Sequence, residues 1–243
     1  MKVRALAHRG YPAKYPENTM SSYQAAYDLG FTHLELDTHL SKDGVPVLMH
    51  DATIDRMTNG SGFVKDYTLE ELRKFRVGEN ETIPTLDEAL RFAKHKMIVN
   101  VELKQQGNLY SDLEETVLKV IKETGMLSQV YVNSFDHYAV LKMRKLSDEI
   151  QLGIIQHGAS PAVIPFMQEI KAKYLSLRIE YLTDEYVRRC DEAGIQIVVW
   201  PVDTDAQLKK MVHYPTVLST TNELERFKQF YEKYMRKNEE DFG

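Results

Sequence analysis

Short apolar runs rich in β-branched residues alternate with longer helical patterns along almost the whole chain. The predicted strands are Val3–Ala7, His33–Thr38, Met97–Leu103, Tyr131–Ser134, Gln151–Ile155, Tyr174–Leu177, Gln196–Val199 and Val217–Ser219. The predicted helices are Met20–Leu29, Leu86–Lys94, Asp112–Glu123, Tyr138–Leu146, Ala162–Ile170, Asp184–Ala193, Ala206–Val212 and Leu224–Tyr234. About eight such repeats are typical of an α/β fold, and they favour a closed TIM (β/α)8 barrel. A doubly wound open sheet is the alternative.

Local signals agree with these boundaries. Thr85 and Glu88 form a capping-box pattern at the start of one predicted helix. Gly30, Gly125 and Gly194 stand where helices should end. No linker rich in Pro, Gly or Ser divides the 243 residues, so we expect one domain over residues 1–243.

One segment interrupts the alternation after the second strand. The sequence Ser41-Lys42-Asp43-Gly44 predicts a hairpin turn that leads into Val45–His50. The following stretch, about residues 51–84, is too long for an ordinary loop between a strand and a helix. We expect it to form a small cap over the carboxyl end of the barrel, with a helix at Leu69–Phe75. The polar tail Arg236–Gly243 is expected to fray.

Composition narrows the range of partners and compartments. Lys and Arg number 31 against 36 Asp and Glu, and a net charge of -5 argues against general binding of nucleic acid or anionic lipid. Cys190 is the only cysteine, which excludes an intrachain disulfide. We see neither a signal peptide nor a run of about 20 apolar residues, so we expect a cytoplasmic protein without stable membrane association.

A His–Arg pair follows the first predicted strand directly. On a barrel, this position places His8 and Arg9 at the rim where active sites lie. The pair offers a group that exchanges protons beside a fork of donors suited to phosphate oxygens. The alternative is a rim histidine beside a surface arginine.

Carboxylates alternate with apolar residues on two predicted strands. Glu35 and Asp37 are two residues apart and project from one face of their strand, and Glu102 and Lys104 repeat this spacing. Three inward carboxylates would repel one another unless a cation or a proton intervened. One divalent cation with oxygen ligands, Mg2+ or Ca2+, would resolve this repulsion. The alternative is a set of salt bridges among Glu35, Asp37, Arg9 and Lys104.

A second imidazole, His50, ends the hairpin strand beside Asp51. Together with His8, a metal and two cations, it favours phosphoryl transfer by general acid and base catalysis without a protein nucleophile. The remaining histidines are more typical of surface or structural positions: His33, His39, His95, His137, His157 and His213. Trp200 and Phe135 follow later strands, and each suits either core packing or contact with substrate carbon.

Taken together, these motifs resemble the glycerophosphodiester phosphodiesterase family over roughly residues 3 to 220. The resemblance rests on His8-Arg9-Gly10, Pro16-Glu17-Asn18-Thr19, Glu35-Leu36-Asp37, Lys42-Asp43-Gly44-Val45-Pro46-Val47, His50-Asp51, Asp55-Arg56-Met57-Thr58-Asn59-Gly60, Ile83-Pro84-Thr85-Leu86, Val101-Glu102-Leu103-Lys104, Ser134-Phe135 and Trp200. A lone His-Arg-Gly would be a weak signal, but this ordered set is specific.

The resemblance implies a TIM-type barrel with a small insertion and a phosphoric diester hydrolase activity. It implies a divalent metal, Mg2+ or Ca2+ with Mn2+ also compatible, on Glu35, Asp37 and Glu102. It further implies His8 and His50 as the acid–base pair, with Arg9 and Lys104 on the phosphate. The implied substrates are glycerophosphodiesters such as glycerophosphocholine or glycerophosphoethanolamine, which yield glycerol 3-phosphate and an alcohol.

One departure from the family pattern lies near the end of the chain. Relatives usually carry Thr-Asp after the eighth strand, whereas this chain reads Thr220-Thr221-Asn222. Two other functions remain open alternatives. One is a relative that stops at the cyclic phosphate, resembling phosphatidylinositol-specific phospholipase C or the spider-venom sphingomyelin phosphodiesterases. The other is a non-catalytic protein that binds phosphorylated ligands.

Overall fold

Eight parallel strands close into a barrel in the computed structural model, which describes residues 2–235. The barrel strands are β1 (Val3–His8), β2 (Phe31–Leu40), β4 (Ile98–Leu103), β5 (Val130–Asn133), β6 (Gln151–Gln156), β7 (Tyr174–Arg178), β8 (Gln196–Trp200) and β9 (Leu218–Thr221). The ring closes because β1 pairs with both β2 and β9. The predicted TIM barrel is confirmed, and the open sheet is wrong. The predicted fraying of Arg236–Gly243 lies outside the described residues.

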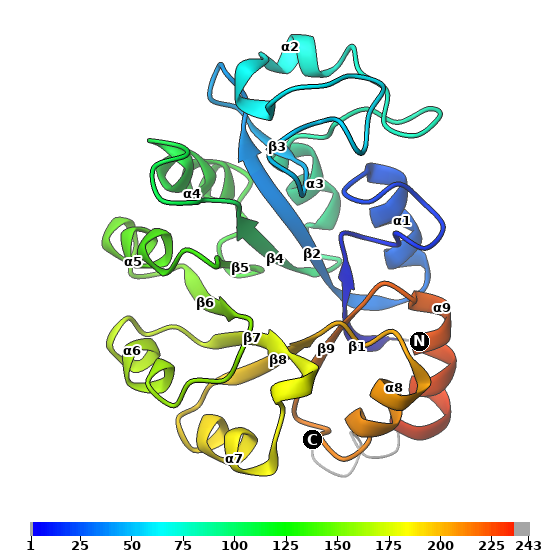
Figure 1. The fold of residues 1–243 in the computed structure, drawn as a ribbon, viewed down its shortest axis with the longest axis vertical. Coiled ribbons are helices and arrows are strands. Elements are labelled where there is room, and N and C mark those ends of the chain that lie inside the picture. Colours follow the sequence, from blue (N-terminus) through cyan, green and yellow to red (C-terminus); the bar gives the residue numbers. More distant parts are fainter. Residues whose placement is uncertain (1, 236–243) are drawn as a thin grey trace.

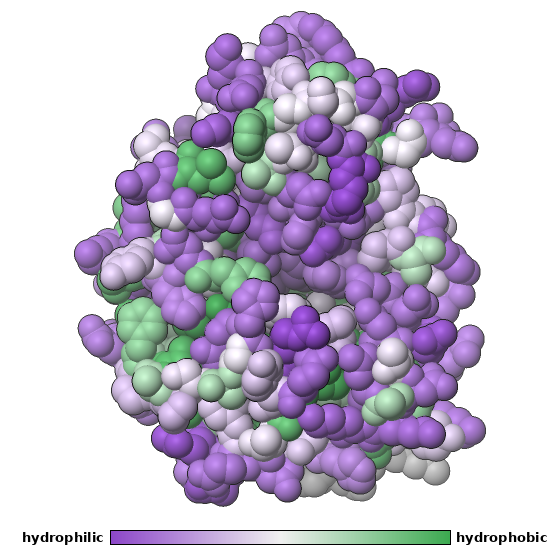
Figure 2. All heavy atoms as spheres, in the orientation of Figure 1, coloured by the Kyte–Doolittle hydropathy of each residue, from purple (hydrophilic) through white to green (hydrophobic). Residues whose placement is uncertain are grey.

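Helices surround the strands, as Figure 1 shows. The same face, drawn as spheres in Figure 2, is mainly hydrophilic, with hydrophobic residues scattered over it. They are α1 (Met20–Asp28), α3 (Leu86–Ala93), α4 (Leu113–Glu123), α5 (His137–Leu146), α6 (Val163–Glu169), α7 (Asp184–Glu192), α8 (Asp205–Met211) and α9 (Leu224–Phe230). The predicted capping box of Thr85 and Glu88 is present at α3. The predicted last helix changes character near its end, where η3 (Tyr231–Met235) takes π-helical hydrogen bonding. A short 3-10 turn, η2 (Ile179–Tyr181), follows β7.

The two faces of the barrel strands differ in chemistry. Outward residues such as Leu34, Leu36 and Val101 join the main core beneath the helices. Inside the barrel, an apolar layer near the amino ends of the strands comprises Leu6, Tyr131, Val198 and Leu218. The next residues inward along these strands, toward the carboxyl ends, are polar or aromatic: His8, Asn133, Trp200 and Thr220. The barrel is therefore packed at one end and carries polar groups at the other.

The insertion forms a cap with its own small core, which stands at the top of Figure 1. Its elements are β3 (Pro46–Leu48), which pairs antiparallel with β2, the 3-10 turn η1 (Val64–Asp66) and α2 (Leu69–Leu72). The predicted helix Leu69–Phe75 is too long. The chain tightens into i→i+3 hydrogen bonds after Leu72, and this turn packs the Phe75 ring edge-on against Tyr67 at 5.2 Å between centroids.

The turn after β1 requires glycine at position 10. Gly10 has φ +86°, and a Cβ there would overlap Ser22 Oγ and lie 2.8 Å from the Ser22 carbonyl carbon. Gly44 provides a control, because it has φ +76° but no atoms within 4 Å of an added Cβ. Gly44→Ala should lower the free energy of unfolding by about 1–2 kcal/mol, the backbone penalty alone. Gly10→Ala should lower it by at least about 1–2 kcal/mol more. Denaturant unfolding measures both, and equal losses would contradict the packing argument.

Candidate active site

A cavity of about 230 Å³ lies at the carboxyl end of the barrel. Its lining includes every residue singled out from the sequence except Asp37, namely His8, Arg9, Glu35, His50, Glu102, Lys104, Phe135 and Trp200. Asp37 lies directly beside the cavity, in ion pairs with Arg9 and Lys104. The structure thus brings residues from β1, β2, β4, β5, β8 and the cap into one place.

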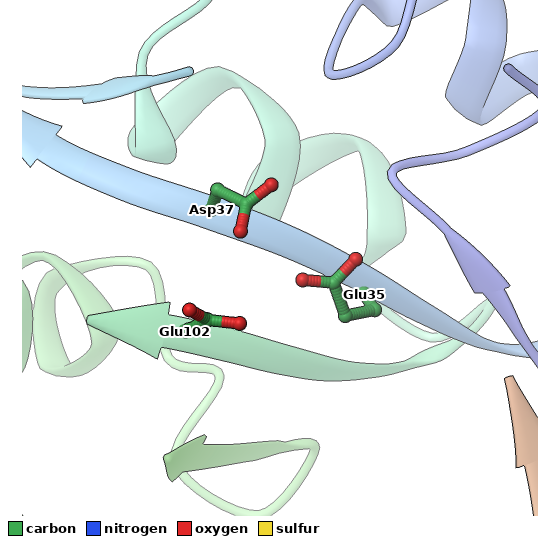
Figure 3. A group of neighbouring side chains, drawn as sticks. All are labelled: Glu35, Asp37 and Glu102. Carbon is green, nitrogen blue, oxygen red and sulfur yellow. The ribbon is translucent and has the colours of Figure 1, made fainter. Parts of the chain in front are cut away.

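Three buried carboxylates converge on neighbouring strands, as Figure 3 shows. Glu35 and Asp37 lie on β2, and the register of β2 with β4 places Asp37 opposite Glu102. Their exposed fractions are 4%, 1% and 9%. One oxygen from each carboxylate lies within 4.8 Å of the others. The inward alternation expected from the sequence is therefore present.

The charges of these carboxylates are strongly perturbed. Burial raises the pKa of Glu35 well above its usual range, and the neighbouring Asp37 and Glu102 raise it further. Burial also raises the pKa of Glu102. For Asp37, burial opposes ionisation, but the charges of Lys104 and Arg9 outweigh it and hold the pKa low. The site therefore has more negative charge than its two cations readily accommodate.

The oxygen ligands fit a hard divalent cation. Glu35 Oε1 is buried and has no hydrogen-bond partner among the described residues, whereas Glu35 Oε2 accepts a hydrogen bond from the Arg9 backbone N–H at 2.9 Å. A buried oxygen without a partner is costly to desolvate, and a cation at this point would satisfy it. All three candidate ligands are carboxylates, the donors that Mg2+, Ca2+ and Mn2+ prefer.

The two predicted phosphate-binding cations also lie here, paired with carboxylates. Arg9 Nε lies 3.2 Å from Asp37, and Arg9 Nη1 lies 3.1 Å from Glu17. Lys104 Nζ lies 2.9 Å from Asp37 and 2.6 Å from Glu102. The salt bridges considered from the sequence are thus present together with the convergent triad. Both cations also line the cavity, so they border the space that a ligand would enter.

Two imidazoles face this cavity from different elements. His8 ends β1, and its Nε2 lies 3.8 Å from Glu35 Oε2. His50 follows β3, and its Nδ1 lies 2.7 Å from the carboxylate of Asp51. Burial, followed by the charge of Arg9, lowers the pKa of His8 to about 4. Burial also lowers the pKa of His50, although Asp37 opposes this shift. Burial thus favours the neutral form of both rings.

An aromatic wall, formed by Phe135, His157 and Trp200, borders the same cavity. The Phe135 and His157 rings stack at 4.9 Å, and the Trp200 ring meets both edge-on. Phe135 is 41% exposed, and Trp200 Nε1 has no hydrogen-bond partner among residues 2–235. His157, which the sequence assigned to a surface or structural position, is an exposed residue that also borders the cavity. The loop after β6 gives no sequence signal for this placement, because it results from the closure of the barrel.

The model of the Glycerophosphoryl diester phosphodiesterase family matches residues 8–224. A glycerophosphodiester phosphodiesterase of Caldanaerobacter subterraneus subsp. tengcongensis is 36% identical over 222 residues, which cover 87% of this chain and 90% of that protein. The chain belongs to this family. It is accordingly a phosphoric diester hydrolase, as the sequence predicted.

Other members of the family agree with this assignment. A glycerophosphodiester phosphodiesterase of Bacillus altitudinis is 31% identical over 86% of this chain and 90% of that protein. Among solved structures, an Oleispira antarctica phosphodiesterase in complex with the product sn-glycerol-3-phosphate superposes with a TM-score of 0.87. It is 25% identical and covers 95% of this chain and 97% of that one. Within residues 2–235 of this family member, we find no helix with the length and apolar character needed to cross a membrane.

Several polar residues in this glycerophosphodiester phosphodiesterase fold were not assigned roles from the sequence. Asn18 is 2% exposed with φ 55°, and its Nδ2 donates to Asp37 at 2.9 Å. Asn18 belongs to the motif Pro16-Glu17-Asn18-Thr19 noted in the sequence, and asparagine tolerates the left-handed backbone conformation. Asn222 and Asp203 form a hydrogen-bonded pair next to His8. Nothing in the linear spacing of residues 203 and 222 indicates that contact.

Proposed function

We propose that this enzyme hydrolyses glycerophosphodiesters, such as glycerophosphocholine or glycerophosphoethanolamine, to glycerol 3-phosphate and an alcohol. The observation that carries the proposal is the meeting of a carboxylate triad, two cations and two histidines in one cavity. Each group matches one need of phosphodiester cleavage: charge neutralisation, phosphate binding and proton transfer. The sn-glycerol-3-phosphate bound to the Oleispira antarctica phosphodiesterase supports the same product class.

In this proposal, Glu35, Asp37 and Glu102 hold one divalent cation, Mg2+ or Ca2+, with Mn2+ also compatible. When bound, such an ion supplies positive charge to the phosphate oxygens. Arg9 offers its guanidinium to the same oxygens, and Lys104 offers a point charge. When the ligand binds, Arg9 and Lys104 each replace part of their ion pairing with the acidic residues by contacts with the phosphate. Phe135 and Trp200 contact the carbon skeleton of the substrate.

Proton transfer falls to His8 and His50. A glycerol hydroxyl adjacent to the phosphate attacks phosphorus, and its proton passes to one imidazole. The bond from phosphorus to the alcohol oxygen breaks, and the other histidine, in its protonated form, gives that oxygen a proton. A cyclic phosphate remains. Water then opens the ring with the two imidazoles in reversed roles, which restores their starting protonation.

Turnover of glycerophosphocholine with and without a chelator tests this proposal. We expect metal-dependent release of choline and glycerol 3-phosphate, with activity lost in excess EDTA and restored by Mg2+, Ca2+ or Mn2+. Phosphorus NMR follows the products. Persistence of a cyclic phosphate would instead favour an enzyme that stops after the first step. Absence of turnover at saturating substrate and metal would favour a non-catalytic binding protein.

A further inference from the structure

A short chain of hydrogen bonds connects His8 to the loops after β8 and β9. Asn222 Oδ1 lies 2.7 Å from His8 Nδ1. On its other side, Asn222 Nδ2 donates to Asp203 Oδ2 at 2.7 Å. The Asn222 backbone N–H donates to Asp203 Oδ1 at the same distance. His8 is thus connected to a carboxylate through an intervening amide.

The chemistry of these groups fixes the direction of each bond. Both oxygens of Asp203 accept hydrogen bonds, so the end of the Asn222 amide that faces them must be its NH2 group. The amide oxygen then faces His8, and it can only accept. His8 must therefore donate from Nδ1. A neutral imidazole carries one ring proton, so the other nitrogen, Nε2, is left with a lone pair.

The same loops hold the amide in this orientation. Thr221 Oγ1 also donates to Asp203 Oδ1 at 3.1 Å, and Arg226 donates to the Asp203 carbonyl at 2.9 Å. The backbone N–H of Val202 donates to the carbonyl of Thr220 at 2.9 Å, which ties the two loops together. A flip of the Asn222 amide would place oxygen against oxygen at Asp203, so it is disfavoured.

We propose that Asp203 and Asn222 are positioning residues that hold His8 as the Nδ1–H tautomer, with Nε2 unprotonated and turned toward Glu35 in the cavity. This inference rests on the proposed function in one respect. The proposed function assigns the tautomer its role, because Nε2 accepts the proton of the attacking hydroxyl. The ring then carries a proton on each nitrogen, and the Nδ1 proton stays on His8, still donated to Asn222. His50 differs, because its Nδ1 contacts a carboxylate, Asp51, directly.

Single and double substitutions at Asp203 and Asn222 distinguish a positioning role from a merely structural role. In the Asp203→Asn variant, nothing forces the amide of Asn222 to keep its oxygen toward His8. In the Asn222→Asp variant, two carboxylates face each other. In the double variant Asp203→Asn/Asn222→Asp, the new carboxylate at position 222 accepts the hydrogen bond from His8 Nδ1. The new amide at position 203 donates to that carboxylate. We expect each single variant to lose at least about ten-fold in kcat with a smaller change in KM, and the double exchange to recover most of the loss.

Nitrogen-15 NMR of the histidine rings reports the tautomer directly, with the His8 signals assigned by their absence in His8→Gln. We expect a protonated Nδ1 and an unprotonated Nε2 in the wild type and the double exchange, and a mixture in Asp203→Asn. Asp184→Asn, the same exchange at the start of α7, should change neither kcat nor the His8 signals. A wild-type Nε2–H tautomer, or no recovery of kcat in the double exchange, would overturn the inference. Because the ring signals need no substrate, they test it even if glycerophosphocholine is not turned over.

Discussion

Replacement of His8 or His50 by alanine is expected to lower kcat by about a hundred-fold to ten-thousand-fold, the range typical of a lost general acid or base. The two rings line one cavity but come from different elements, His8 from the end of β1 and His50 from the start of the cap. Each has its Nδ1 engaged by a neighbour, Asn222 or Asp51. In the proposed mechanism, proton transfer in the cavity therefore uses the Nε2 atoms.

The two losses should not add, because both histidines serve the same step in the proposed mechanism. The double variant should therefore retain nearly the activity of the weaker single variant. His33→Ala is the matched control, since His33 lies buried on a barrel strand and, like His8, has a pKa lowered to about 4 by burial, but does not line the cavity. It should lower the melting temperature and leave kcat nearly unchanged. Near-native kcat in either active-site variant, at saturating substrate and metal, would remove that residue from the mechanism.

The barrel and the convergent groups were predictable because they follow from local periodicity. A period of two along β2 and β4 decides which side chains point inward, and adjacent parallel strands must then align their inward residues. Glu35, Asp37 and Glu102 meet for this reason alone. His8 and Arg9 were placed at the rim because they directly follow a strand.

The contacts that the sequence did not indicate form only when the barrel closes. The aromatic wall needs the loops after β5 and β6 to meet the end of β8, and His157 has no neighbouring motif that indicates its position. The contact of Asn222 with His8 needs β9 to pair with β1, a separation of 214 residues along the chain. Periodicity cannot specify such contacts, since they depend on loop conformations rather than on strand alternation.

The cap is tied to the barrel by ion pairs that local patterns also did not reveal. Arg56 contacts Asp51 at 2.7 Å and Glu17 at 2.6 Å, and Glu17 in turn contacts Arg9. Through these links, the segment that carries His50 is connected to the arginine beside the triad. The ion pairs therefore link the segment that carries His50 to Arg9, one of the two proposed phosphate-binding cations.

Addition of Mg2+, Ca2+ or Mn2+ to the metal-free enzyme is expected to raise its melting temperature by roughly 5–10 °C at a hundred-fold excess over Kd. Glu102→Gln should nearly abolish this shift and lower kcat by at least about a hundred-fold at a fixed, limiting metal concentration. The glutamine keeps the size of the side chain but removes one of three negative charges, so metal affinity falls. A higher metal concentration should then restore part of the lost activity.

A purely structural salt-bridge cluster makes the opposite prediction. If Glu102 only pairs with Lys104, Glu102→Gln lowers stability by leaving a buried ammonium group with one negatively charged partner fewer, and metal ions have no effect on either protein. Glu114→Gln is the matched control: Glu114 is 1% exposed and lies 2.9 Å from Lys142, but outside the triad. It should lose stability yet keep the full metal-induced rise in melting temperature and the wild-type kcat. An equal metal response in all three proteins, or none in the wild type, would show that the carboxylates hold cationic side chains rather than a metal ion.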